Sequence, residues 1–129
     1  MLRDGERLRT RHIRLEGEWS DDYGVRAGDA LAIYGDLGIA HPAVWPALAN
    51  HLVHTEVARG SWIHTRSLIR HHTTAPAGAT VDVHGVVVGR FDTRHGERAV
   101  LDVLIEHNGS PVATIEHEAI VALHDVPSP

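Results

Sequence analysis

Two side chains that could transfer protons, Asp36 and His41, lie five residues apart in the segment DLGIAH. An imidazole exchanges protons near neutral pH, and a nearby carboxylate can orient it or activate water. We therefore predict that His41 is a catalytic acid or base and that Asp36 assists it. Each residue also has a structural interpretation, because His41 could fix the entry of the chain into the following helix and aspartate is common in exposed turns.

The helix expected after His41 carries three further candidates, Trp45, Asn50 and Glu56. We predict that Trp45 and Asn50 line a substrate pocket, where the Asn50 amide hydrogen-bonds an oxygen of the substrate. For Trp45 the alternative is a buried contact between helix and sheet. Glu56 could position water, but it lies near the end of the helix, where a solvated charge is the simpler interpretation.

The 12 histidines of the chain invite a metal-site hypothesis. His51 and His54 are spaced to share a helical face, whereas His71 and His72 would point to opposite faces of a strand. No H-E-x-x-H or similar signature occurs, so we predict neither a metal site nor a cofactor. His117 lies between apolar neighbours and is interpreted as a core histidine with a satisfied hydrogen bond.

Composition excludes several classes of protein and site. The 129 residues suffice for one domain, and the absence of cysteine excludes disulfides, thiolate metal sites and a cysteine nucleophile. All 12 basic residues are arginines, so no lysine is available to form a Schiff base. The net charge of -5 and the lack of a long apolar run argue against nucleic-acid and membrane partners. The charged N-terminus is unlike a signal peptide, so we expect a cytoplasmic protein.

The regular part of the chain begins with a helix. Pro42 and Gly60 bracket an apolar pattern of helical period, which predicts a helix over 42–58. Four strands rich in β-branched residues are then predicted, at 62–72, 80–90, 98–107 and 112–123. Asn108-Gly109 between the last two indicates a tight hairpin. The pattern favours an α+β domain in which long antiparallel strands curl around one helix.

The first 40 residues are less regular. Residues 12–19 alternate in polarity, which predicts a strand. Four glycines punctuate residues 20–40, where we expect turns and one short helix around 29–34.

Three segments carry a resemblance to a known family. IAHPAVWPALANHLV is similar to the start of the central helix in MaoC-like hydratases, commonly written I-A-H-G before an apolar helix. WIHTRSLIRHHTTAPAGATVDVHGVVVGR resembles their next two strands, and GERAVLDVLIEHNGSPVATIEHEAIVAL resembles their closing hairpin. The resemblance covers 36–123 of a single domain, 1–129, which leaves an N-terminal strand and turns, 1–35, and a tail, 124–129. It implies the hot-dog fold, in which a curved antiparallel sheet wraps a long central helix.

The same resemblance implies an acyl thioester as the ligand, carried by coenzyme A or by acyl carrier protein. The acyl chain would lie beside the central helix, in a site completed by a second subunit. We therefore expect a homodimer or a hetero-oligomer with another hot-dog chain. Hydration or dehydration of 2-enoyl and 3-hydroxyacyl thioesters is the leading activity. The alternatives are a thioesterase in which Glu56 or His41 positions water, and a catalytically silent partner of another hot-dog chain.

The catalytic motif of the family, D-x-N-P-x-H, is matched only in part. Asp36 and His41 keep its spacing, but Gly38 and Ile39 stand where Asn and Pro belong. His41 also matches the histidine of I-A-H-G, and one residue cannot occupy both positions. Pro42 replaces the glycine of that motif, which removes a backbone amide that would polarise the thioester carbonyl.

Overall fold

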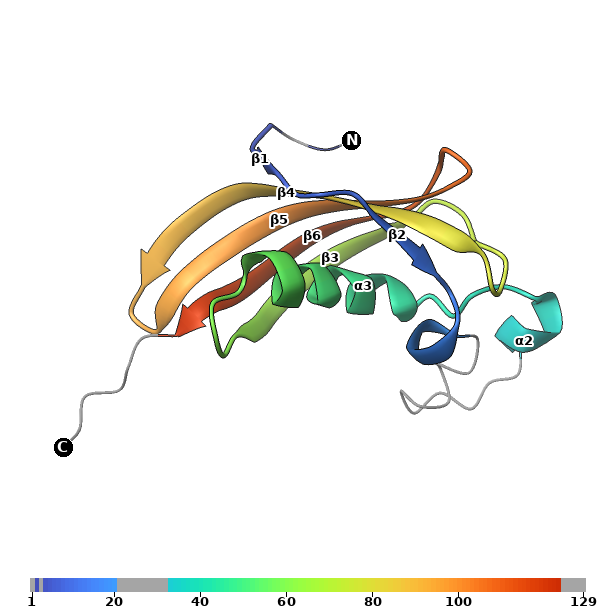
Figure 1. Cartoon of the computed structure of the whole chain (residues 1–129), viewed down its shortest axis with the longest axis horizontal. Helices are drawn as coiled ribbons and strands as arrows, with labels where there is room; N and C mark the ends of the chain where they lie inside the picture. Colours follow the sequence, from blue (N-terminus) through green and yellow to red (C-terminus); the bar gives the residue numbers. More distant parts are fainter. Residues whose placement is uncertain (1, 3, 21–32, 124–129) are drawn as a thin grey trace.

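A curved antiparallel sheet arches over one helix, α3, which lies along its concave side (Figure 1). This computed structural model describes residues 2, 4–20 and 33–123. The strand order is β1-β4-β5-β6-β3, and β2 also pairs with β4. The strands are β1 (Glu6–Arg7), β2 (Arg11–Arg14), β3 (Ile63–His71), β4 (Thr80–Thr93), β5 (Gly96–His107) and β6 (Ser110–Leu123). The predicted α+β architecture is confirmed.

The central helix forms where the apolar periodicity predicts it. Helix α3 (Val44–Leu52) continues as a π-helical turn, η2 (Val53–Val57). The Ala58 N–H donates to the Val53 carbonyl at 2.7 Å, five residues back, and this bond closes the wider turn. The helix and its π turn bury one apolar face against the sheet, made of Val44, Trp45, Leu48, Ala49, Leu52, Val53 and Val57. No helix in the described part of the chain combines the length and the apolar character needed to cross a bilayer.

All four long strands predicted after the helix are present. The turn at Asn108-Gly109 has φ angles of 51° and 78°, the left-handed geometry of a two-residue hairpin turn. Strand β4 continues past its predicted end to Thr93, because the connection to β5 is a tight turn at 94–95. Strand β3 lies at the edge of the sheet and pairs, within the described chain, with β6 alone.

The N-terminal segment departs from the strand predicted over 12–19. Strand β2 ends at Arg14, and a short 3-10 turn, η1 (Gly17–Trp19), follows it. Gly17 has φ +59°, a left-handed conformation that an extended strand does not contain. The predicted strand forms but is shorter than expected, because the polar alternation continues through a residue at which the backbone turns.

Two other expectations fall largely outside the described residues. Of the short helix expected around 29–34 only the last two positions are described, and they begin α2 (Ile33–Leu37). The tail over 124–129 also lies outside the described part of the chain.

Gly96 begins β5 at a point where no side chain fits. Its φ is +154°, and a Cβ there would lie 2.3 Å from the carbonyl oxygen of Ala122. We expect Gly96→Ala to lower the free energy of unfolding by about 2 kcal/mol, measured by urea denaturation. Gly89→Ala is the matched control in the neighbouring strand, because nothing lies within 4 Å of a Cβ placed there. Equal losses in the two variants would contradict this account.

Candidate functional site

His41 caps the turn that leads into α3. Only 7% of its surface is exposed. The backbone N–H of Ala43 donates a hydrogen bond to His41 Nδ1 at 3.0 Å, and the ring of Tyr34 lies 4.4 Å from the imidazole, centre to centre. A side chain that accepts this N–H caps the turn at 42–43, which leads into α3, in the way that an N-cap residue caps a helix. Pro42 suits the next position, because it has no N–H to satisfy.

Capping determines which nitrogen of the neutral imidazole carries the proton. Because Nδ1 accepts the Ala43 N–H, the proton of the neutral ring is on Nε2. The next two amides are also engaged, since the Val44 N–H donates to the His41 carbonyl at 3.1 Å and the Trp45 N–H to the Pro42 carbonyl at 3.2 Å. The backbone amides at the start of α3 are therefore engaged, and the neutral His41 ring carries its proton on Nε2.

A cavity of about 380 Å³ opens beside His41, between the start of α3 and the end of β3. We call it the α3 pocket. Ala40 and Pro42, the two neighbours of His41 in the chain, both line it, and so does Trp45. The rest of the lining comes from Tyr34, Ile39, His71, His72, Thr73 and Thr74. Largely apolar walls with a few convergent polar groups are typical of small-molecule sites.

The predicted site residues are only partly brought together. Trp45 lines the α3 pocket although 2% of its surface is exposed, so it is both a core residue and a pocket wall. Asp36 is exposed on α2, and among the described residues no hydrogen bond joins it to His41. Tyr34 packs against His41 instead. Sequence reasoning missed Tyr34, because its contact depends on how α2 lies against α3 and no local pattern marks it.

Asn50 lies farther along α3 and is paired with a buried histidine. Its Oδ1 is 2.8 Å from Nε2 of His117 on β6. His117 is fully buried, its Nδ1 has no partner among the described residues, and the exposed ring of His64 stacks on it at 4.3 Å. Burial and, secondarily, the charge of His64 lower the pKa of His117 from 6.5 to about 4, so the ring is neutral at physiological pH. His117 is therefore a core histidine, with one of its two nitrogens satisfied.

Glu56 belongs to an ion-pair cluster that joins the N-terminal segment to the end of the central helix. Its Oε1 lies 2.5 Å from Arg11 Nη1 and 3.5 Å from Arg9 Nη2. The Glu56 carboxylate is thus paired with two guanidinium groups. This arrangement fits the interpretation of Glu56 as a structural charge better than a role in positioning water.

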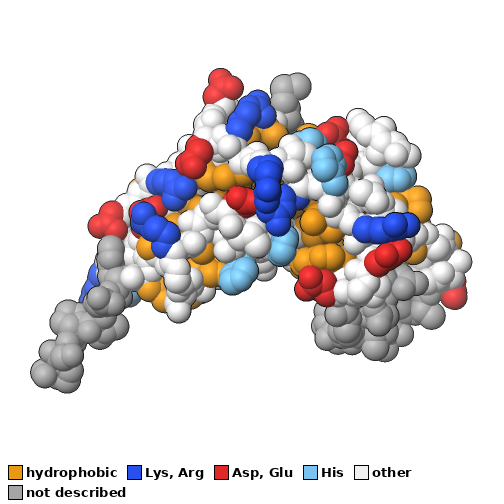
Figure 2. All heavy atoms as spheres, in the orientation of Figure 1, with side chains coloured by type: hydrophobic (Ala, Val, Ile, Leu, Met, Phe, Trp, Pro, Cys, Tyr) orange, Lys and Arg blue, Asp and Glu red, His pale blue; other side chains and the backbone are white. Residues whose placement is uncertain are grey.

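The histidines of the helix contact tryptophans. The His51 ring lies 5.6 Å from that of Trp19, edge to face, and Trp62 Nε1–H donates to His54 Nδ1 at 3.2 Å. Across the described ranges, no group of three or more His, Asp and Glu side chains could hold a metal ion. Figure 2 shows histidines and charges of both signs dispersed over this face of the molecule, with no single-sign patch.

No protein-family model matches the sequence, and neither does any curated protein. The structure matches the (R)-hydratase from A. caviae involved in PHA biosynthesis, with a TM-score of 0.74 and 14% identity over 93% of this chain and 97% of that chain. The chain adopts the hot-dog fold.

Two further hot-dog structures show the range of proteins with this architecture. The ChsH1-ChsH2 complex from Mycobacterium tuberculosis matches with a TM-score of 0.73 and 15% identity, over 96% of this chain and 100% of that chain. A hypothetical thioesterase with coenzyme A from Streptococcus pneumoniae TIGR4 matches with a TM-score of 0.54 and 19% identity, over 69% of this chain and 72% of that chain. At such identities the likeness establishes the fold, and the activity has to be argued from the site.

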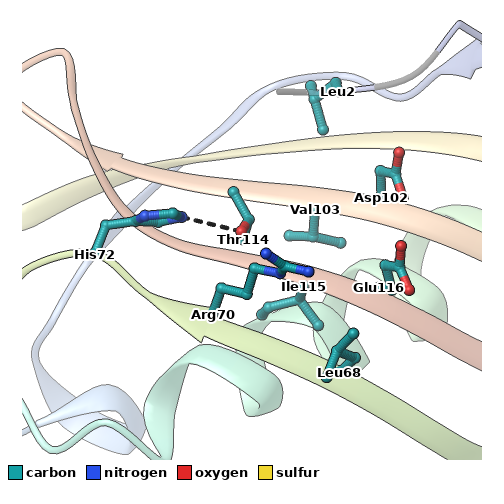
Figure 3. Close-up of a pocket in the computed structure, with 9 residues that line it drawn as sticks. All are labelled: Leu2, Leu68, Arg70, His72, Asp102, Val103, Thr114, Ile115 and Glu116. Atoms are coloured by element: carbon teal, nitrogen blue, oxygen red, sulfur yellow. Dashed lines mark hydrogen bonds between the residues drawn. The ribbon is translucent and has the colours of Figure 1, made fainter.

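A second groove, of about 360 Å³, lies on the face of the hot-dog sheet that points away from α3 (Figure 3). Glu116 borders it, and because neighbouring strand residues point to opposite faces, Glu116 points away from the helix that His117 contacts. Arg70 and Asp102 line the same groove, so both signs of charge are present. His72, bonded to Thr114 at 3.0 Å, borders both this groove and the α3 pocket.

Proposed function

We propose that this hot-dog protein binds an acyl thioester of coenzyme A or acyl carrier protein in the α3 pocket. We further propose that it interconverts 2-enoyl and 3-hydroxyacyl thioesters, with His41 as the residue central to the chemistry. The observation that carries this proposal is the position of His41. It is buried, held by a backbone N–H and flanked on both sides by residues that line the pocket. The presence of an (R)-hydratase among the structural neighbours supports the same reaction.

The geometry refines the role predicted for His41. In hydration, water adds its hydroxyl at C3 and a proton at C2, while negative charge develops on the thioester oxygen. A neutral imidazole that donates from Nε2 can stabilise that oxygen. In this way His41 would supply the hydrogen bond that the engaged amides of α3 cannot give. A carboxylate must still activate the water, and Asp36 on the adjacent α2 remains our candidate for it.

A panel of coenzyme A thioesters tests this reaction directly. We expect the purified protein to consume the enoyl absorbance of a 2-enoyl-CoA without release of free thiol. Thiol release from a saturated acyl-CoA would instead assign a thioesterase, the activity named for one structural neighbour. If neither signal is seen and a second hot-dog chain co-purifies with the protein, this chain would be assigned as a catalytically silent partner.

We propose that a second hot-dog copy pairs along β3. This edge strand has nine residues and pairs with β6 on one side. Ile63 and Leu68 expose 49% and 53% of their surfaces there. An exposed edge of this length is a template for strand pairing, and charges on such an edge oppose it.

Sedimentation equilibrium measures this pairing. We expect a dimer for the unmodified protein and a monomer for the double variant Ile63→Lys, Leu68→Lys. Phe91→Lys is the control, because Phe91 is also exposed, at 47%, but lies on β4, across β5 and β6 from the β3 edge. A monomer for the unmodified protein would point to a different hot-dog chain as the partner.

A further inference from the structure

The pair formed by Asn50 and His117 is too far from His41 to act on the same atoms. Asn50 follows His41 by nine residues, which corresponds to about 13 Å along a helix axis at about 1.5 Å per residue. The reacting carbons of a thioester and its carbonyl oxygen are adjacent, so they cannot contact both residues. If Asn50 binds the ligand, it binds a different part of it.

The direction of the hydrogen bond shows what Asn50 can offer. The amide oxygen of Asn50 can only accept, so Nε2–H of the neutral His117 is the donor in this contact. The amide nitrogen therefore points away from His117. The amide nitrogen of Asn50 carries two N–H donors, and no described residue accepts a hydrogen bond from it. Asn50 is half-buried, so these donors lie at the border between core and solvent.

Stability alone does not account for a histidine at position 117. Its Nδ1 is buried without a partner among the described residues, and an unsatisfied buried acceptor costs about 1–3 kcal/mol. Ile115 and Ala119 flank it on the same face of β6 and are both buried, so an apolar side chain would suit the site. The contact that an apolar residue could not provide is the hydrogen bond to Asn50.

We propose that His117 is a positioning residue that holds the Asn50 amide with its N–H donors outward, where they bind a hydroxyl or keto oxygen on the acyl chain, remote from the thioester. This inference rests on the proposed function. It adds the class of acyl group to it: an oxygen-bearing chain that extends from the α3 pocket along α3 toward β3.

Isothermal titration calorimetry with matched ligands tests the proposal. The probes are dodecanoyl-CoA and its derivatives with one hydroxyl at C8, C10 or C12, saturated chains that hydration does not consume. We expect one hydroxylated probe to bind roughly fivefold more tightly than the unsubstituted chain, the gain from one net hydrogen bond. The ratio of the two dissociation constants is the readout, because a general loss of structure weakens both probes together.

Three variants separate positioning from packing. Asn50→Asp keeps the acceptor for His117 but removes the N–H donors, so the preference for the hydroxylated probe should disappear. His117→Leu should abolish it too, since the Asn50 amide is then free to rotate. His117→Gln should restore most of it, because the glutamine amide can donate to Asn50 in place of Nε2.

The outcomes distinguish this inference from the proposed function. If the unmodified protein binds dodecanoyl-CoA and hydrates 2-dodecenoyl-CoA but shows no preference for any hydroxylated probe, the inference is overturned and the proposed function stands. A preference that survives His117→Leu would overturn the positioning role of His117. If no acyl-CoA binds at all, the proposed function itself fails.

Discussion

His41→Asn is expected to lower kcat for hydration of a 2-enoyl thioester by roughly 10²- to 10³-fold, with little change in stability. Asparagine is among the best N-cap residues, so its Oδ1 can accept the Ala43 N–H that His41 Nδ1 accepts now. What the variant loses is the donor at the position of Nε2, because the asparagine Nδ2 takes the place of the ring carbon Cδ2. Removing one preorganised donor to a developing oxyanion costs a factor of this size. The variant thus separates the chemical role of His41 from its capping role.

Steady-state kinetics and urea denaturation on the same samples check this prediction. His41→Ala is the companion variant, because it removes both functions and should also lose about 1 kcal/mol of stability through the missing cap. Unchanged turnover in His41→Asn would show that His41 only caps the helix. A comparable loss of stability in both variants would show that asparagine does not replace the cap.

Acidification from pH 7 to pH 4 is expected to remove about 3 kcal/mol of stability through His117 alone. Its pKa is lowered from 6.5 to about 4 in the folded chain, and each unit is worth about 1.4 kcal/mol. Between these two values the unfolded chain binds a proton that the folded chain does not, so stability falls as the pH falls. The loss begins near the ordinary histidine pKa and is complete near pH 4.

Urea denaturation at a series of pH values measures this effect, with His117→Leu as the reference. All other titrating groups are common to the two proteins, so the difference between the two curves isolates His117. His64 is stacked on it, and its charge is the second cause, after burial, of the lowered pKa of His117. Parallel curves for the two proteins between pH 4 and pH 7 would contradict the prediction.

The sequence predicted those parts of the fold that depend on local signals. The predictions of the helix after His41 and of the hairpin at Asn108-Gly109 are both confirmed. Helical periodicity and a left-handed turn depend on residues that are close together in the sequence. The strand predicted over 12–19 forms only as far as Arg14, because Gly17 takes a left-handed backbone angle although the polarity pattern continues. Local patterns do not report that angle.

The candidate site was less accessible to sequence reasoning, because its contacts join distant residues. Asn50 and His117 were each noted separately, but they are 67 residues apart and only the packing of α3 on β6 brings them together. Asp36 and His41 were paired on spacing, whereas the structure places Tyr34 against the imidazole. Spacing predicts proximity within one element, and here α2 and α3 are two elements.

The π-helical turn at the end of the central helix is separated from the edge strand by a short connection. The turn takes up about one residue more per turn than an α-helix, and the Ala58 N–H closes it on the Val53 carbonyl. Residues 58–62 then lead to β3, whose register is set by its pairing with β6. The loss of one residue within 53–57 would therefore be absorbed by the helix end and this connection, and would leave His64 stacked on His117.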